Sequence, residues 1–349
     1  MKRLLMFVLV CALSACEKDN PVNTPNNGLE PITFGEAVTR ANITTDDITE
    51  DGFGVYAFVN TGANGTSGAG IYESLLGDNS GAERVYIDAT TGGWTYDNTK
   101  FWLADRVYQF LGVYPYDYPY DAPYTITTAS GNPTGISRTF TTPPAADEDM
   151  VLARAIYDTS VATPESVEMN FEHMLANVNF KVWRDGAKHQ NDQMRVKKVT
   201  LSNVRKKGTY YSATNAWEMT NDKMTMEYTN NTLADKDNIG AAVTKADGSW
   251  DFGGEASTPF SSLLLIPQNT NDASNSISLK IEYELKRQNA VDWETKVLEA
   301  DLPSIAWKAG QRYTYNVVLS SVTYITVYYI QTTVDPWGTP QVGGTVIIK

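Results

Sequence analysis

The chain has 349 residues, of which 41 are Asp or Glu and 28 are Lys or Arg, so its formal net charge at pH 7 is −13. An acidic surface of this kind repels phosphate groups and argues against nucleic acid and anionic lipid as partners. The length suffices for two domains, because single domains usually contain about 100 to 200 residues. Both cysteines lie within the first sixteen residues, so the sequence predicts no disulfide, redox site or cysteine-bound metal in the folded part.

The first fifteen residues have the pattern of a bacterial signal peptide. Lys2 and Arg3 give it a positive start, and the apolar run at residues 4–13 is too short to span a bilayer. The run ends in the tetrapeptide LSAC, which resembles the lipobox of bacterial lipoproteins. That resemblance implies that residues 1–15 are removed and that Cys16 is lipidated, leaving 26 basic against 41 acidic residues and a net charge of −15. The alternative is an ordinary secretory signal in which Cys16 happens to follow small residues.

The next part of the chain predicts a short tether followed by strands. Residues 16–30 are rich in Pro and Asn and poor in apolar side chains, which is typical of a disordered tether. From residue 31 onward, short runs of β-branched and aromatic residues alternate with turn residues, a pattern typical of strands. We expect strands at residues 54–59, 106–116, 136–142, 177–183, 195–204, 262–267, 276–285, 312–320, 324–334 and 345–348.

One of these strands shows its two faces directly. Ile277, Leu279, Ile281, Tyr283 and Leu285 alternate with Ser, Lys and Glu, so we expect one face to be buried and the other exposed to water. Only residues 165–176 have helical periodicity, and that segment is short and contains residues of low helix propensity.

Strands separated by turns over this length predict an all-β fold of two tandem β-sandwich domains. Pro164 interrupts the strand pattern, so we place the first domain at residues 31–164 and the second at residues 165–349. No apolar run after residue 13 approaches the roughly 20 residues of a membrane span, which predicts that the remainder of the chain stays outside the membrane.

The residues that usually carry catalysis or bind metal are scarce. His173 and His189 are the only histidines, and neither has Cys or a second His at metal-ligand spacing, so we expect structural or surface roles for both. The acidic run at residues 147–149 lacks the remaining ligands of a calcium loop and is interpreted as a solvated turn. The glycine-rich segment at residues 62–70 has no Gly-Lys-Ser/Thr after it, so it is not a phosphate-binding loop. The sequence therefore predicts no catalytic residue, no metal site and no cofactor.

A cluster of tyrosines supports a second hypothesis. Tyr114, Tyr116, Tyr118 and Tyr120 alternate with Pro and Asp, and Tyr124 follows. Exposed Tyr rings beside Asp can stack on sugar rings and bind their hydroxyl groups. The simpler interpretation, which we favour, is a strand end whose rings pack onto the sandwich, with each Pro at an edge or turn.

Several segments together resemble the Bacteroidales fimbrillin family, the Mfa-like and FimA-like pilins of type V pili. They occur in the order found in that family and are spread across most of the chain from residue 31 to residue 320. The segments are ITF at 32–34 followed by Arg40, GVYAF at 54–58, residues 107–116 ending in Tyr-Pro-Tyr, DMVLA at 149–153, FEHMLANV at 171–178 and WKAGQRYTY at 307–315.

This resemblance implies two transthyretin-like β-sandwiches and a structural role in a pilus at the outer membrane, to which lipid on Cys16 attaches the precursor. It also implies that a trypsin-like protease cuts between Arg40 and Ala41, that residues 31–40 then leave as a strand, and that a strand from another subunit fills the groove. Ile32, Phe34 and Val38 fall on one face of the departing strand, and Glu36 interrupts that face. The donor would come from residues 324–334 or 345–348, which the turn at 335–338 separates.

Two other functions remain open at this point. A monomeric, surface-exposed glycan-binding lipoprotein is the alternative, and it would have to keep Cys16 to stay attached. A glycosidase with carboxylates paired across strands is a more distant hypothesis. The sequence does not distinguish a shaft, tip or anchor subunit, and it does not identify the target of adhesion.

Overall fold

The architecture comes from a computed structural model that describes residues 29–38, 45–60, 72–116, 124–140, 149–234, 237–246, 250–253, 255–273, 275–320, 325–333 and 341–347. Cys16, Arg40 and Ala41 lie outside these residues. The prediction of an all-β fold is confirmed, and the one α-helix of the described part is α1 (Thr45–Asp51). Within the same ranges, no helix has the length and apolar character needed to cross a membrane.

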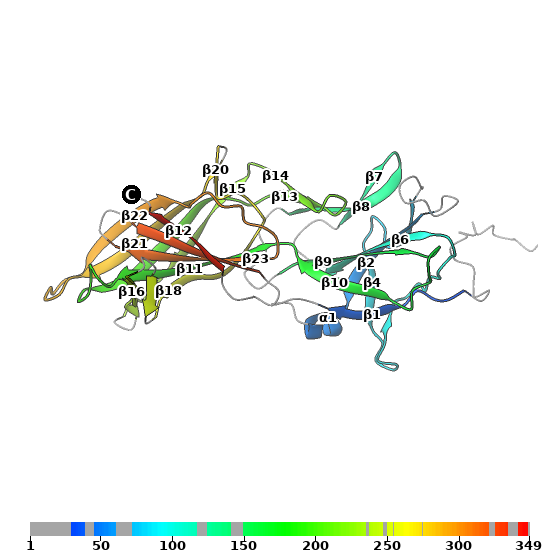
Figure 1. Cartoon of the computed structure of the whole chain (residues 1–349), viewed down its shortest axis with the longest axis horizontal. Helices are drawn as coiled ribbons and strands as arrows, with labels where there is room; N and C mark the ends of the chain where they lie inside the picture. Colours follow the sequence, from blue (N-terminus) through cyan, green and yellow to red (C-terminus); the bar gives the residue numbers. More distant parts are fainter. Residues whose placement is uncertain are drawn as a thin grey trace, which may run out of the picture.

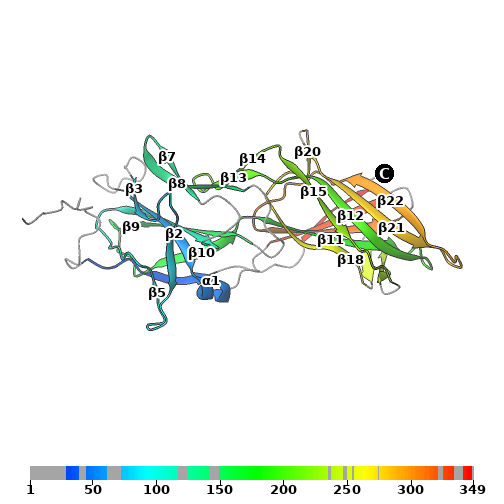
Figure 2. The same ribbon diagram turned by 180° about the vertical axis from the view of Figure 1, so that it is seen from behind.

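The molecule is elongated, with an N-terminal unit at one end and a C-terminal unit at the other (Figures 1 and 2). Two sheets form the N-terminal unit. The larger sheet has the order β1 (Phe34–Val38), β10 (Val167–His173), β9 (Val151–Asp158), β6 (Val107–Tyr114), β2 (Phe53–Asn60), β4 (Glu83–Ile87) and β5 (Trp94–Thr95), and β3 (Tyr72–Leu76) also pairs with β2. The smaller sheet has the order β14 (Ala216–Met219), β13 (Gly208–Tyr211), β8 (Asn132–Phe140) and β7 (Thr125–Ala129).

The C-terminal unit is a second sandwich. Its larger sheet has the order β17 (Trp250–Gly253), β16 (Ala241–Thr244), β11 (Ala176–Asp185), β23 (Gln311–Leu319), β24 (Ile325–Thr333) and β25 (Gln341–Ile347), and β18 (Ser257–Leu265) also pairs with β11. Its smaller sheet has the order β15 (Lys223–Thr229), β12 (Gln193–Arg205), β21 (Ser278–Lys286) and β22 (Glu294–Asp301), and the short pair β19 (Asn271–Asp272) and β20 (Asn275–Ser276) stands apart.

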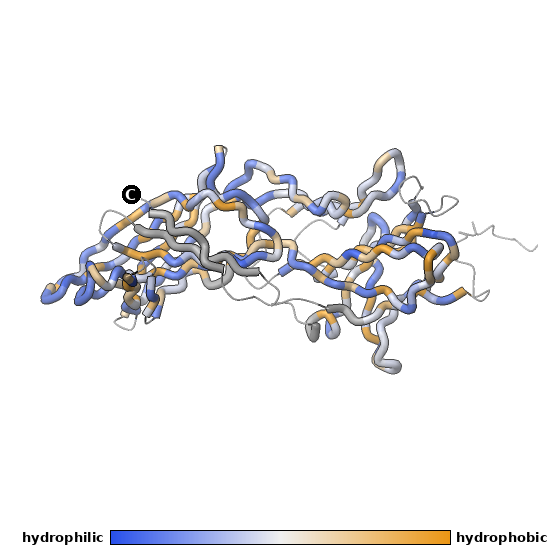
Figure 3. The backbone as a smooth tube through the Cα atoms, viewed as in Figure 1, coloured by the Kyte–Doolittle hydropathy of each residue, from blue (hydrophilic) through white to orange (hydrophobic). Residues whose placement is uncertain are grey.

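The alternation of apolar and polar residues determines which strand faces form the core. The five apolar residues predicted to share a face at residues 277–285 are all fully buried in the C-terminal core, which confirms that prediction. Val199 and Tyr315 pack in the same core from the neighbouring strand and the opposite sheet. Figure 3 shows the result along the chain, with apolar segments in the strands and hydrophilic residues at the outer turns of the C-terminal unit.

Strand pairing shifts the division between the two units away from Pro164. Strand β10 follows that proline, yet it pairs with β9 and β1 of the N-terminal sheet. It is a strand despite its weak helical periodicity, because its residues alternate strictly between buried and exposed. The chain therefore enters the C-terminal unit only after His173. The proline marks a turn, which is a local signal, whereas membership of a sheet depends on distant pairing.

A hairpin and an apolar cluster join the two units. The hairpin β13–β14 lies between β12 and β15 in the sequence, but β13 pairs with β8 from Gly208 and Phe140 to Tyr211 and Ser137. Next to this hairpin, a junction cluster packs residues from both units: Phe140, Met150, Met174, Leu175, Tyr210, Leu264 and Ile266. The junction thus contains both strand pairing and a small core of its own.

Candidate strand-exchange groove

The first strand of the N-terminal unit is an edge strand. Among the described strands, β1 pairs only with β10, in parallel, with Phe34 opposite Val167 and Ala37 opposite Met169. The register is irregular between these two pairs. Parallel pairs are slightly less stable per residue than antiparallel ones, and an edge strand has a single neighbour. β1 is therefore held by few main-chain contacts compared with the strands inside the sheet.

Main-chain contacts hold the residues just before β1 on both sides. The N–H of Ile32 donates to the carbonyl oxygen of Lys100 over 2.8 Å, and the N–H of Trp102 donates to that of Glu30 over 2.9 Å. On the other side, the N–H of Val167 donates to the carbonyl oxygen of Thr33 over 2.8 Å. The segment before β1 thus bridges the loop at residues 100–102 and the start of β10.

The hydroxyl group of Tyr96 adds a side-chain contact to the three main-chain hydrogen bonds of this segment. It donates to the carbonyl oxygen of Ile32 over 2.9 Å and accepts a hydrogen bond from the N–H of Lys100 over 2.9 Å. Burial raises the pKa of Tyr96 to about 12, so the phenol remains a donor across the physiological range. Tyr96 therefore connects the segment before β1 to the loop at residues 100–102.

An aromatic pocket receives the side chain of Phe34, which is 6% exposed. Its ring lies 5.9 Å from that of Phe53, 5.6 Å from that of Tyr96 and 6.2 Å from that of Phe110, each nearly perpendicular to it. Ile32 is buried as well, at 1%. Burying an apolar side chain of this size contributes roughly 1.5 to 3 kcal/mol. The predicted shared face of Ile32 and Phe34 is thus buried, while the side chains of Glu36 and Val38 lie outside the described set.

Departure of β1 would expose two complementary features at once. One is the free edge of β10, whose N–H and C=O groups face the vacated position. The other is the Phe34 pocket with its aromatic walls. An incoming strand with an apolar side chain at the right register satisfies both, which is the physical basis of strand addition.

The predicted cut site lies between β1 and α1. β1 ends at Val38 and α1 begins at Thr45, so the Arg40–Ala41 bond belongs to the connection between two anchored elements. On the far side, Ile48 is fully buried, and the side chain of Asp51 accepts a hydrogen bond from the hydroxyl of Tyr114 over 2.8 Å. The chain after the cut is consequently fixed to the sandwich by its own contacts.

The C-terminal hairpin lies at the edge of the other unit. β24 pairs antiparallel with β23 from Gln311 and Thr333 to Leu319 and Ile325, and β25 pairs in turn with β24. β25 is the last strand of this sheet among the described residues. In Figure 1 the hairpin, in red, belongs to the C-terminal unit, whereas β1, in blue, belongs to the N-terminal unit. Strands are present at both predicted positions, 324–334 and 345–348, while Tyr324, Val334, Ile348 and the turn at 335–338 lie outside the described residues.

The two histidines are both buried beside a carboxylate. Nδ1 of His173 makes a hydrogen bond to Oδ2 of Asp149 next to the junction cluster, where the two side chains are 4% and 3% exposed. Asp149 thus belongs to a buried pair, although we interpreted the run at 147–149 as a solvated turn. Asp147 and Glu148 lie outside the described residues.

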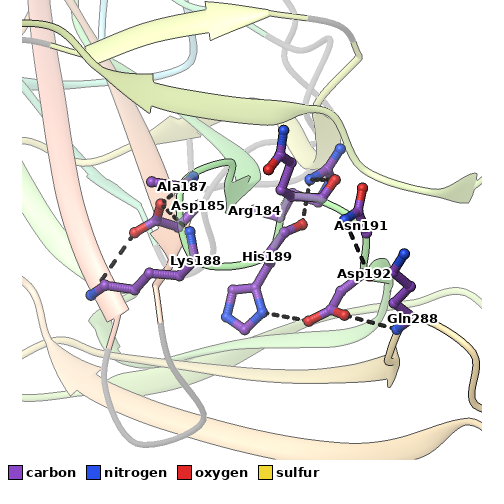
Figure 4. Close-up of polar contacts among 9 residues, drawn as sticks. Arg184, Asp185, Ala187, Lys188, His189, Asn191, Asp192 and Gln288 are labelled. Carbon is purple, nitrogen blue, oxygen red and sulfur yellow. Dashed lines mark hydrogen bonds and ion pairs between the residues drawn. The ribbon is translucent and has the colours of Figure 1, made fainter.

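His189 lies in the turn between β11 and β12, and Figure 4 shows its ring beside Asp192. Its Nδ1 is 2.9 Å from Oδ2 of Asp192, whose Oδ1 accepts a hydrogen bond from the N–H of Gln288 over 3.0 Å. Burial alone would raise the pKa of Asp192, but these hydrogen bonds lower it below its usual value. Asp192 thereby connects this turn to the turn after β21.

The described residues contain no group of three or more His, Cys, Asp or Glu side chains placed to hold a metal ion. The tyrosine cluster is divided: Tyr114 and Tyr124 are buried, as packing onto the sandwich requires, whereas Tyr116 is half-buried at the surface. Tyr118 and Tyr120 are outside the described residues.

Sequence reasoning missed most of the groove. It identified Ile32 and Phe34 but not Tyr96 or the loop at residues 100–102, which are distant in sequence. The neighbouring strand β10 could have been predicted from the alternation of buried and exposed residues at 167–173. The weak helical periodicity of residues 165–176 obscured this alternation.

Comparisons relate the chain to known proteins. A family model described as fimbrillin-like matches residues 39–337. A solved fimbrial protein from Bacteroides vulgatus is 20% identical, with a TM-score of 0.64 over 88% of this chain and 99% of that chain, which shows a shared fold. A second solved structure, of a protein from Bacteroides uniformis named for cell adhesion, is 16% identical, with a TM-score of 0.41 over 89% of this chain and 100% of that chain. A third, of a fimbrial assembly protein from Parabacteroides distasonis, is 12% identical, with a TM-score of 0.37 over 90% of this chain and 97% of that chain. A search of curated proteins finds no match.

Proposed function

Because this chain belongs to the fimbrillin-like family, whose model matches residues 39–337, we propose that it is a pilus subunit that assembles by exchanging strands after proteolysis. The family gives the chain a structural, pilus-associated adhesion role at the cell surface. The finer proposal rests on the edge position of β1. Among the described strands β1 pairs only with β10, and its Phe34 side chain fills an aromatic pocket. Such a role needs contacts between subunits rather than a catalytic residue, a metal or a cofactor.

The first step is export and cleavage. The precursor is lipidated on Cys16 and reaches the outer membrane, where a trypsin-like protease cuts between Arg40 and Ala41. Support comes from the anchoring of the elements on either side, β1 and α1, because a cut between them breaks the chain without disturbing the sandwich. After cleavage, β1 is held only by non-covalent contacts.

The second step is replacement of β1 by a strand of another subunit. The donor in this proposal is the C-terminal hairpin β24–β25, an edge element of the other unit. β25 pairs only with β24 among the described strands, so its release breaks fewer main-chain contacts than release of β24. Repetition of the exchange links subunits in a head-to-tail polymer.

The experiment compares the full chain with a variant that ends at Ser320 and therefore lacks the hairpin. Both proteins are digested briefly with trypsin, and polymer is measured by light scattering and electron microscopy. We expect the full chain to polymerise only after digestion. The truncated variant should retain a cooperative melt by circular dichroism and form no polymer. Polymerisation of the truncated variant, or loss of its cooperative melt, would contradict the assignment of the donor.

A further inference from the structure

A polar hollow lies on the N-terminal unit, where the end of α1, strand β4 and the turn after β6 meet. Its volume is about 230 Å³, and it is lined by Asp51, Arg84, Tyr114, Pro115 and Tyr116. We refer to it as the Arg84 hollow. Pockets for drug-sized ligands usually measure roughly 300 to 1,000 Å³, so this one is suited to a smaller group.

A glycine on strand β2, Gly54, leaves the space in which this site forms. Gly54 is in register with Arg84 on one side and with Val113 on the other. A Cβ atom at position 54 would lie 2.7 Å from the Cβ of Ala82 and 3.1 Å from the Cβ of Tyr116. Glycine thus leaves room for Tyr116 to lie on the sheet beside Arg84, and for Ala82 and Val113 next to it.

The cation of the site is held by aromatic rings. The guanidinium carbon of Arg84 lies 4.9 Å from the ring centroid of Tyr116 and 5.7 Å from that of Tyr86. Its Nη2 donates to the main-chain oxygen of Asp51 over 2.7 Å. These contacts fix the plane of the guanidinium before any ligand arrives, which reduces the entropy lost on binding.

The site retains hydrogen-bonding capacity. The bond to Asp51 is the only hydrogen bond that Arg84 makes to described residues, although a guanidinium has five N–H donors. The carboxylate of Asp51 uses Oδ2 to accept from Tyr114, and Oδ1 accepts from no residue of the described part. Donors and an acceptor therefore lie side by side, with the Pro115 and Tyr116 rings next to them.

We propose that the Arg84 hollow binds one neutral sugar ring at the end of a glycan. Neighbouring hydroxyl groups of a sugar can donate to the free oxygen of Asp51 and accept from Arg84, while its C–H face packs on an aromatic ring. The Asp51 carboxylate and the net charge of −13 disfavour an acidic sugar. This ligand goes beyond the strand-exchange function and requires neither cleavage nor polymerisation.

The test uses the uncleaved full chain, purified in detergent, and methyl glycosides of glucose, galactose, mannose and N-acetylglucosamine as probes. Binding is detected by saturation-transfer NMR and quantified by titration, with the methyl glycoside of N-acetylneuraminic acid as the acidic comparison. We expect at least one neutral glycoside to bind, and the acidic one not to bind.

Three variants locate the binding. Arg84→Gln removes the cation, Tyr116→Leu removes the ring, and Asp51→Asn removes the charge but leaves an acceptor for Tyr114. Loss of a hydrogen bond to a charged group should weaken binding about tenfold or more. The matched control is Arg106→Gln, because Arg106 also donates to a main-chain oxygen, that of Asp105 over 3.1 Å, away from the hollow.

Retained binding in the control and weakened binding in the correctly melting variants would support the site. The proposal is overturned if no neutral glycoside binds, if only the acidic glycoside binds, or if the variants bind as the unmodified protein does. Because the chain stays uncleaved in this experiment, such a failure would leave strand exchange unaffected.

Discussion

Replacing Phe34 with Ala tests whether the aromatic pocket holds β1 in place. Phe34 is 6% exposed and meets three rings edge to face. Truncation of a buried Phe to Ala usually costs about 3 to 5 kcal/mol. We expect a loss near the lower value here, because the pocket at an edge strand can partly close around the smaller side chain. A loss of about 3 kcal/mol corresponds to about a hundredfold weaker retention of the cleaved strand, since each 1.4 kcal/mol is tenfold.

The assay measures how much of the fragment ending at Arg40 remains bound after limited trypsin digestion. The cut protein is diluted in steps and separated from released fragment by size exclusion, and the bound fraction is measured by mass spectrometry. The matched control is Phe53→Ala, because Phe53 belongs to the same pocket but lies on β2 and stays in the protein after cleavage.

The two substitutions should differ in a specific way. Phe34→Ala should lower the melting temperature of the uncut chain and leave that of the cut, strand-depleted protein unchanged, whereas Phe53→Ala should lower both. Retention of the fragment within threefold of the unmodified protein would refute the assignment of the Phe34 pocket. An unchanged melting temperature of the uncut Phe34→Ala chain would refute it as well.

Three further outcomes follow from the contacts. Tyr96→Phe should weaken retention of the cleaved strand by about 1 kcal/mol, because it removes the hydrogen bond to Ile32, while Tyr86→Phe, at a half-buried Tyr that bonds Asp97 instead, should not change it; the same fragment assay measures both. Asp149→Ala should lower the free energy of unfolding by about 3 kcal/mol or more in denaturant titrations, because it leaves buried His173 without its carboxylate, and a loss below 1 kcal/mol would contradict this. The melting temperature should fall between about pH 10 and 12, because burial raises the pKa of Tyr96, Tyr210 and Tyr283 to about 12 and only the unfolded phenols ionise near 10; a level profile through pH 12 would be the contrary result.

Periodicity in the sequence predicted the strands better than it predicted their neighbours. The alternation at residues 277–285 is a local property, and its buried face follows directly from it. The pairing of β13 with β8 joins residues about seventy positions apart, and no local pattern indicates it. The same limit explains the displaced boundary at Pro164, since a proline shows where a strand stops but not which sheet the next strand joins.

The groove shows a similar division. An apolar face containing Ile32 and Phe34 was visible in the sequence, because a period of two places both side chains on one side. The partners Phe53, Tyr96 and Phe110 come from three other segments, and only the folded sheet brings them together. The Arg84 hollow arises in the same manner from Asp51, Arg84 and Tyr116, of which only the tyrosine belonged to a recognisable cluster.

The central claim is that this subunit loses its first strand before it assembles. The most direct measurement is the N-terminal sequence of this protein in filaments sheared from the surface of cells that express the full chain. Our account predicts that the sequence begins at Ala41. A protein that begins at Cys16 in sheared filaments would contradict cleavage at Arg40, and with it the release of β1.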